Sequence, residues 1–156
     1  GGIKGSVADE FATVIANPVR KRAPYPMPPR VLVETISLIA AELPRADRVT
    51  VGMPGMIRHG RVIATPHYIT KDGPRSKVVP ELKDAWRNFD MKAAIEGAFD
   101  LPTIVLNDAE VAGAGVITGT GLEMIITLGT GLGNAIFDSG ALSPHAELSQ
   151  GLVRWG

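Results

Sequence analysis

Two short polar segments carry the residue types that phosphoryl transfer requires. The first, residues 127–133, reads Thr-Leu-Gly-Thr-Gly-Leu-Gly and joins two apolar, strand-like runs. Glycine tolerates a positive φ, so its amides can wrap around an anion, and threonine hydroxyls add donors for phosphate oxygens. The second, Asn107-Asp108, directly follows the apolar run 103–106. A carboxylate at a strand end can take the proton of an acceptor hydroxyl while a glycine turn holds the donor, so the two segments predict a phosphoryl-transfer site.

Each segment also has a simpler structural interpretation. Asp108 could cap the helix that follows it, because an aspartate at a helix start accepts backbone amides. The glycine turn could be a tight hairpin that binds no ligand. Two other nucleotide-binding motifs fit worse. The turn joins two strands, whereas a dinucleotide-binding fingerprint joins a strand to a helix, and no glycine is followed by the Lys-Ser/Thr pair of a P-loop.

The composition limits the class of protein. The 156 residues suit one ordinary domain, or a small domain with part of another. Sixteen basic residues balance sixteen acidic ones, so no global field directs the chain to nucleic acid or to an anionic membrane. No cysteine is present, which excludes disulfides, a thiol nucleophile and cysteine-ligated zinc. No apolar run has the length of a membrane span, and we expect a cytoplasmic protein.

Periodicity and turn residues predict a mixed α/β chain. Asp90 is the expected N-cap of a helix, small residues in the last helix predict close packing, and Trp86 and Phe89 are expected in the core. Loops are expected at 24–29 and 70–77. The expected strands are 3–8, 11–15, 19–23, 48–53, 103–106, 124–128 and 134–137, with a hairpin at 56–65 that turns at Gly60. The expected helices are 31–43, 79–87, 91–99 and 109–117.

Several motifs, taken in order along the chain, resemble those of the ROK sugar kinases, a family with an actin-like, ribonuclease-H-type ATPase fold. Among these the chain is most similar to bacterial polyphosphate/ATP glucokinases. The resemblance implies a small domain over 1–108 and the start of an incomplete large domain over 109–156. Gly1–Gly5 reads as the middle of a longer sequence, so we expect a fragment. The matching stretches are 2–5, 51–55 with Arg58 and Gly60, 86–90, 107–109 with Ala112 and Gly113, 127–133 and 147–148.

The resemblance also implies a role for individual residues. Asp108 would be the base that takes the proton from the sugar hydroxyl, and Asn107 and Glu147 would bind other sugar hydroxyls. His67 stands near the place of a family asparagine and is a further candidate for the sugar cleft. The residues that would bind phosphate are Gly1, Gly2, Lys4, Thr127, Gly129, Thr130, Gly131 and Gly133.

These roles imply a kinase that transfers a phosphoryl group from ATP or polyphosphate to a hexose, with the 6-hydroxyl of glucose as the expected acceptor. Mg²⁺ is expected to arrive with the donor, because the chain shows no dedicated carboxylate cage, and no structural zinc is expected. Homodimers are common in the family. Ser149-Gln150 replaces the family's Gly-His pair, which bears on the choice of sugar. A non-catalytic, sugar-binding transcriptional regulator of the same family remains the alternative.

Overall fold

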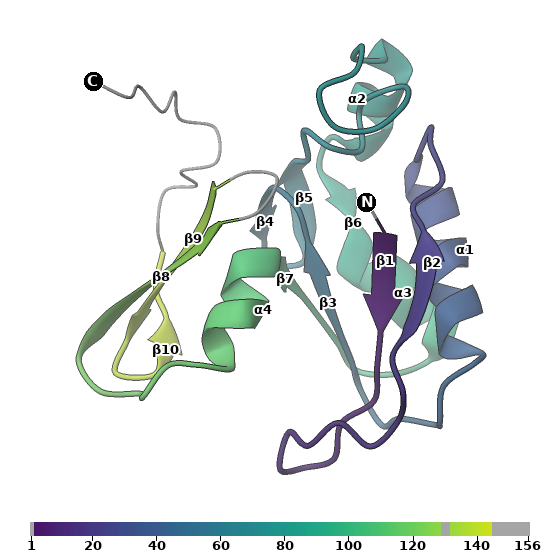
Figure 1. Ribbon diagram of the computed structural model, residues 1–156. Helices are drawn as coiled ribbons and strands as arrows, with labels where there is room; N and C mark the ends of the chain where they lie inside the picture. The colour runs from purple at the N-terminus through teal and green to yellow at the C-terminus, as the bar shows by residue number, and fades with distance from the viewer. Residues whose placement is uncertain (1, 129–131, 145–156) are drawn as a thin grey trace, which may run out of the picture.

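The computed structural model describes residues 2–128 and 132–144. Short strands alternate with four helices in this part of the chain (Figure 1). The helices are α1 (Pro29–Ala40), α2 (Pro80–Trp86), α3 (Met91–Phe99) and α4 (Asp108–Ala114). The strands are β1 (Gly2–Gly5), β2 (Val19–Arg22), β3 (Val49–Met53), β4 (Met56–Arg58), β5 (Arg61–Ala64), β6 (Phe89–Asp90), β7 (Thr103–Asn107), β8 (Leu122–Leu128), β9 (Leu132–Asp138) and β10 (Ala141–Leu142).

The strands form four small sheets, and one of them is parallel. β1 pairs with β2, β5 pairs with β4 and β6, and β9 pairs with β8 and β10, all antiparallel. β3 and β7 form the parallel pair, in which Met53 lies opposite Asn107. The two strands therefore end at the same level, and the residues that follow them leave the sheet at one edge, where ligands of parallel sheets usually bind.

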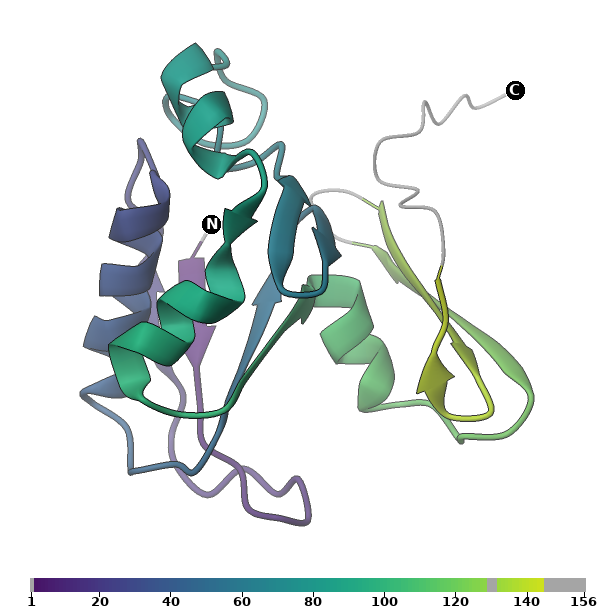
Figure 2. The same ribbon diagram turned by 180° about the vertical axis from the view of Figure 1, so that it is seen from behind.

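The helices hold these sheets together. α1 and α3 lie side by side, as Figure 2 shows from behind; α1 contacts β1 and β2, and α3 contacts β5 and β7. α4 packs against β3 and β7 and also contacts β8 and β9, so it connects the parallel pair to the β8–β9–β10 sheet. None of the helices in the described residues combines the length and the apolar character needed to span a bilayer.

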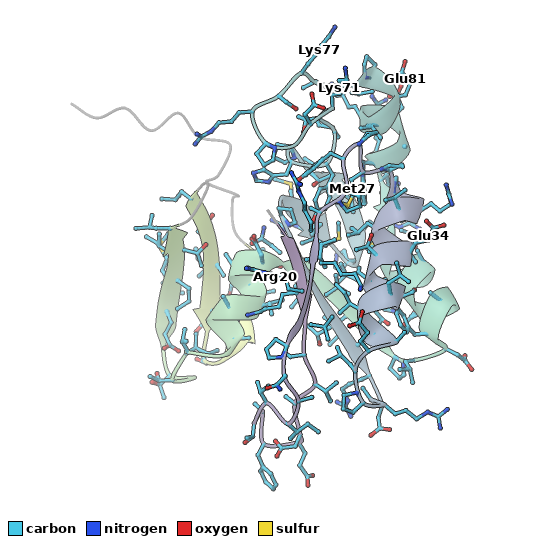
Figure 3. All side chains as sticks on the ribbon, turned by 45° about the vertical axis from the view of Figure 1, so that its right-hand side comes forward. Arg20, Met27, Glu34, Lys71, Lys77 and Glu81 are labelled. Carbon is cyan, nitrogen blue, oxygen red and sulfur yellow. The ribbon has the colours of Figure 1, made fainter. Side chains whose placement is uncertain are left out.

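Trp86 lies in the apolar core, as predicted, and Phe89 packs against that core. The Trp86 indole N–H donates to the main-chain oxygen of Met27 across 2.8 Å, and the rings of Tyr68 and Phe89 lie against the indole at centroid distances of 5.5 and 5.7 Å. Met27 lies on the inner side of α1, whereas Glu34 projects from the outer side of that helix (Figure 3). Burial of large apolar side chains such as Trp86, Met27 and Tyr68 supplies the main driving force for the fold.

Most of the predicted elements are confirmed. The hairpin at 56–65 turns through His59 and Gly60, whose φ values of 50° and 78° are the left-handed pair that a two-residue hairpin turn prefers. Asp90 caps α3, because its Oδ1 accepts a hydrogen bond from the Ala93 amide across 2.9 Å. The last helix ends at Ala114, earlier than expected, where Gly115 follows as its C-cap.

The strand predicted at 11–15 is wrong. Oδ1 of Asp9 accepts hydrogen bonds from the amides of Phe11 and Thr13, at 3.0 and 2.9 Å, which bends the backbone into a turn. Only an isolated bridge between Ala8 and Val14 remains of the expected pairing. An aspartate that binds nearby amides offers the backbone an alternative to a strand, and here that local effect outweighs the apolar pattern.

Candidate active site

One cavity of about 1200 Å³ brings together residues from distant parts of the chain. Its walls come from β1, α1 and β3, from the segment 66–68, from the start of α4 and from facing residues of β8 and β9. The predicted site residues that line it are Gly2, Lys4, His67, Asn107, Asp108, Thr127 and Gly133. The other predicted site residues, Gly1, Gly129, Thr130, Gly131 and Glu147, lie outside the described residues.

The cavity differs in character along its length. Between β1 and β3, each of which pairs with one neighbour among the described strands, it is lined by backbone and by apolar side chains such as Leu32 and Ile36 of α1. Beyond the carboxyl ends of β3 and β7 the lining includes His67, Asn107 and Asp108, and this region is called the polar end of the cavity. Arg45, Asp47 and Arg48, which precede β3, also line the cavity.

Asp108 is the first residue of α4, and its side chain is exposed to the cavity. The cap of this helix is the preceding residue, Asn107, although Oδ1 of Asp108 also accepts from the Ala109 amide across 3.0 Å. The parallel register brings the chain of β3 close to the same point, since a β-carbon built on Gly52 would lie 3.5 Å from the Asp108 Cα. The carboxylate thus emerges where the two parallel strands end.

Asn107 connects three elements through its amide and its backbone. Its Oδ1 accepts from the Ala109 amide at 2.7 Å, and its Nδ2 donates to the main-chain oxygen of Gly55 at 2.6 Å. Its own backbone N–H donates to Oε2 of Glu110 at 2.8 Å, which completes a reciprocal capping box. Asn107 is only 3% exposed, so these bonds are sheltered from water. The side chain starts α4 and ties it to the turn after β3.

Glu110 is a residue that the sequence prediction missed. The spacing Asn-x-x-Glu before a helix is the signature of a capping box and was available as a signal. Its carboxylate is buried, and Oε1 lies 3.7 Å from the guanidinium of Arg58. The capping box therefore contains a charge that the β4–β5 hairpin balances.

The flanks of the predicted phosphate turn lie beside the start of α4. Thr127 of β8 and Gly133 of β9 are opposite each other in the antiparallel register. A β-carbon built on Gly133 would come within 2.6 Å of the Thr127 Oγ1 and 3.0 Å of the Ala109 Cβ. Only glycine leaves room here, so the Thr127 hydroxyl lies over bare backbone next to the helix that carries Asp108.

The segment after β5 adds polar groups that have no partner in the described part of the chain. Thr65 Oγ1 and His67 Nδ1 are both buried without a hydrogen bond to any described residue. Tyr68 follows and is 9% exposed. Burial raises the pKa of Tyr68 first, and repulsion from Tyr25 and then from Asp108 raises it further. The Tyr68 phenol is therefore neutral at ordinary pH, as is favourable near the carboxylate of Asp108.

Basic side chains stand beside Gly2. Lys4 of β1 pairs in register with Arg20 of β2, and the Arg20 Nε lies 3.6 Å from a β-carbon built on Gly2. Figure 3 shows Arg20 on the side of β2 that faces away from α1. Among the described residues, neither Lys4 nor Arg20 forms an ion pair with an acidic side chain. Such cations suit an anionic ligand.

The same residues do not form a metal cage. In the described ranges, no group of three or more His, Cys, Asp or Glu side chains is arranged to hold a metal ion. Asp108 is the acidic side chain at the polar end of the cavity.

Known proteins resemble this chain along most of its length. A polyphosphate glucokinase of Mycobacterium tuberculosis (strain ATCC 25618 / H37Rv) is 25% identical over 154 residues, which cover 94% of this chain and 53% of that protein. The crystal structure of inorganic polyphosphate/ATP-glucomannokinase from Arthrobacter sp. strain KM is 31% identical, with a TM-score of 0.72, and the match covers 95% of this chain and 58% of that one. A ROK family glucokinase from Streptomyces griseus, in complex with glucose and AMPPNP, gives a TM-score of 0.71 at 24% identity, over 96% of this chain and 45% of that one.

The chain spans about half the length of the curated relatives it matches. Its arrangement of strands and helices is the mixed α/β fold of the ROK actin-like sugar kinases, as the resemblance implied. The model of one family, described as the ROK family, matches residues 3–144. That match covers most of the chain and takes in nearly all of the cavity's lining, from β1 to the β8–β9 hairpin. The chain therefore belongs to the ROK family.

Proposed function

We propose that the protein is a sugar kinase that transfers a phosphoryl group from ATP or inorganic polyphosphate to a hexose, with the 6-hydroxyl of glucose as acceptor. One observation carries the proposal: Asp108 and the Thr127–Gly133 pair line the same cavity, one from the end of β7 and the other from the β8–β9 hairpin. The names of the polyphosphate glucokinase and the polyphosphate/ATP-glucomannokinase support the substrate classes.

Asp108 acts on the acceptor in this proposal. Its carboxylate takes the proton of the sugar hydroxyl while the hydroxyl oxygen forms a bond to phosphorus. The bond between phosphorus and the leaving oxygen breaks, and the electron pair stays on the remaining donor. Phosphoryl transfer depends mainly on positioning and on neutralisation of charge, so an exposed carboxylate with a fixed backbone suffices as base.

The donor lies on the other side of the transferred group. We assign its phosphates to Gly2, Lys4, Thr127 and Gly133, whose backbone amides, ammonium group and hydroxyl are donors for phosphate oxygens. Gly1, Gly129, Thr130 and Gly131 belong to the same cradle in this proposal. Mg²⁺ is part of the donor substrate and arrives bound to its phosphates, where it neutralises their charge.

The sugar occupies the polar end of the cavity. Asn107 and His67 both line this end, and Nδ1 of His67 is buried without a partner among the described residues. We assign both, together with Glu147, to the sugar hydroxyls. The proposed domain boundary lies between residues 108 and 109, at the helix that contacts both β3 and β9. Closure there would exclude water, which competes with the sugar as acceptor.

The test is sugar-dependent phosphoryl transfer by the intact protein, with ATP and polyphosphate compared over a panel of hexoses. Asp108→Asn should reduce turnover at least ~100-fold, the scale of a lost general base. Asp84→Asn is the matched control, because its side chain is 70% exposed on α2 and lies away from the cavity. Undiminished turnover in Asp108→Asn would remove the assigned base.

The transfer assay, combined with a binding measurement, separates the kinase from the regulator. Ser149-Gln150, which replaces the Gly-His pair of the family, is the feature that favours a sugar-binding protein without catalysis. Calorimetric titration of the intact protein with each hexose measures binding independently of transfer. Binding of a hexose with no transfer from either donor would favour the regulator.

A further inference from the structure

Glu110 is a buried acid next to the proposed base. It is 3% exposed, and among the described residues it is the one charged side chain in the buried class. Burial of a carboxylate is unfavourable unless the group is hydrogen-bonded and its charge is balanced. A glutamine would complete the same capping box without a charge. The presence of a charge at this position therefore calls for an explanation beyond helix capping.

The two oxygens of the Glu110 carboxylate bind different elements. Oε2 accepts from the backbone N–H of Asn107 across 2.8 Å, at the junction of β7 and α4. Oε1 lies 3.7 Å from Nη1 of Arg58 in β4, and the same Nη1 donates to the Ile57 main-chain oxygen across 2.8 Å. Arg58 is half-exposed, whereas the carboxylate is sheltered. Glu110 thus joins the β4–β5 hairpin to the first turn of α4.

Asp108 lies between two residues, Asn107 and Glu110, whose hydrogen bonds and ion pair are described above. The residue before it, Asn107, is fixed by its side-chain bonds to Ala109 and Gly55, and its backbone N–H is fixed by Glu110. The backbone around Asp108 is therefore held on both sides, and its exposed side chain lines the cavity. The hairpin that supplies Arg58 also leads into His67, at the polar end of that cavity.

We propose that Glu110, held by Arg58, is a positioning residue that sets the direction of the Asp108 carboxylate relative to the acceptor hydroxyl. The inference rests on the proposed function, because it assumes that Asp108 is the base. The charge on Glu110 fixes the distance between the hairpin and α4, which an uncharged cap would leave adjustable. A displacement of about 1 Å in such a group can reduce turnover about 100-fold.

The test compares Glu110→Gln with a matched capping acid elsewhere. Glu110→Gln keeps an acceptor for the Asn107 N–H and removes the charge that faces Arg58. Asp90→Asn is the control, because Asp90 also caps a helix and also pairs with an arginine, Arg61, at 2.7 Å, but it does not line the cavity. Both variants alter a cap and an ion pair, and only one of them adjoins the base.

Glu110→Gln should lower kcat about 10- to 100-fold while the KM values for sugar and donor stay within about twofold, because no residue assigned to substrate binding is replaced and an acceptor for the Asn107 N–H remains, so that mainly the alignment of the base is lost. The pH at half-maximal rate on the acid side should move down and not up, since removal of a nearby negative charge favours the ionised form of Asp108. Arg58→Lys, which keeps the charge and loses the planar fork, should give a smaller loss of kcat in the same direction. Asp90→Asn should leave kcat unchanged, whatever its effect on the melting temperature.

A structural readout accompanies the kinetics. The backbone amide resonances of Asp108 and Ala109 should move in Glu110→Gln and stay in place in Asp90→Asn. If Glu110→Gln retains wild-type kcat, or raises KM in proportion to its loss of kcat, the positioning role is refuted. Asp108→Asn is measured in the same series. Lost turnover in Asp108→Asn with retained turnover in Glu110→Gln rejects this inference alone, whereas retained turnover in Asp108→Asn rejects the base and the positioning role together.

Discussion

The Asn107 side-chain amide donates a hydrogen bond to the main-chain oxygen of Gly55 across 2.6 Å, although 52 positions separate the two residues along the chain. The bond joins the end of β7 to the turn after β3. Gly55 has a φ of 107°, and a β-carbon on it would lie 2.1 Å from the Ala64 oxygen, so that turn requires glycine. The proposed base thus starts from a rigid junction of two strand ends.

Replacement of Asn107 by aspartate should weaken this junction. The new carboxylate would face the Gly55 oxygen with no hydrogen to donate, at a site that is 3% exposed. An unsatisfied polar group of this kind costs about 2–3 kcal/mol of unfolding free energy. Chemical denaturation measures the loss. Asn88→Asp, at an exposed position, should change the unfolding free energy by less than about 0.5 kcal/mol.

Gly113→Ala tests the close contact of α4 with the β8–β9 hairpin. The added β-carbon would lie 2.7 Å from a ring carbon of Phe137 and 3.1 Å from Ile125. Overpacking costs about 1–3 kcal/mol, and the better helix propensity of alanine returns about 1 kcal/mol, so a net loss is expected. Gly97→Ala in α3 is the matched control: no atom lies within 4 Å of its added carbon, and it should raise the melting temperature.

Gly133→Ala should disturb the proposed phosphate cradle. The new methyl would meet the Thr127 hydroxyl oxygen at 2.6 Å, which forces that side chain to move. We expect a lower melting temperature and weaker binding of the donor in equilibrium titrations. The double variant Thr127→Ala/Gly133→Ala should recover part of the stability, because the clashing oxygen is gone. It should not recover donor binding, because a hydroxyl donor has been lost with it.

The two tyrosines of the chain should titrate late, and Tyr68 last. Burial, then Tyr25, then Asp108 raise the pKa of Tyr68 above its ordinary value of 10.0. A raised pKa means that the unfolded chain loses this proton first, so the stability due to neutral Tyr68 is complete below pH 10.0 and declines as the pH rises further. Phenolate absorbance of wild type and Tyr68→Phe identifies the late step.

The same titration reports the electrostatic interaction between Tyr68 and the proposed base, Asp108. Asp108→Asn removes a negative charge that opposes ionisation of Tyr68, so the late step should move to lower pH. The comparison needs no substrate and no turnover. An unchanged late step in Asp108→Asn would show that the carboxylate does not act on Tyr68 in solution.

The elements best predicted from the sequence are those fixed by short-range signals. The hairpin at 56–65 depends on a glycine at its turn, and α3 depends on Asp90 at its start and on an apolar stripe. The strand predicted at 11–15 failed for the same kind of reason, because Asp9 binds the amides of Phe11 and Thr13 more favourably than a partner strand would. Hydrogen bonds and turn residues close in sequence therefore explain both the correct predictions and the wrong one.

The site was predictable as a set of residue types, and its assembly was not. A carboxylate at a strand end and a glycine–threonine turn are visible in the sequence, as is the capping-box spacing that marks Glu110. The contacts of Asn107 with Gly55 and of Glu110 with Arg58 depend on which strands pair and in which register. That pairing is a long-range property, which no window of neighbouring residues contains. The roles assigned to all the site residues, Asp108 and Glu147 among them, stay predictions.

The parallel pairing of β3 with β7 also has a consequence for biosynthesis. Parallel neighbours require a long crossover, and here it includes the β4–β5 hairpin, α2 and α3. Closing so large a loop makes the pairing of β3 with β7 entropically costly and slow. β7, which leads into Asp108, can join β3 only after the intervening chain has left the ribosome. A nascent chain that ends inside α3 would hold a finished hairpin and an unpaired β3, an exposed edge of the kind that chaperones protect.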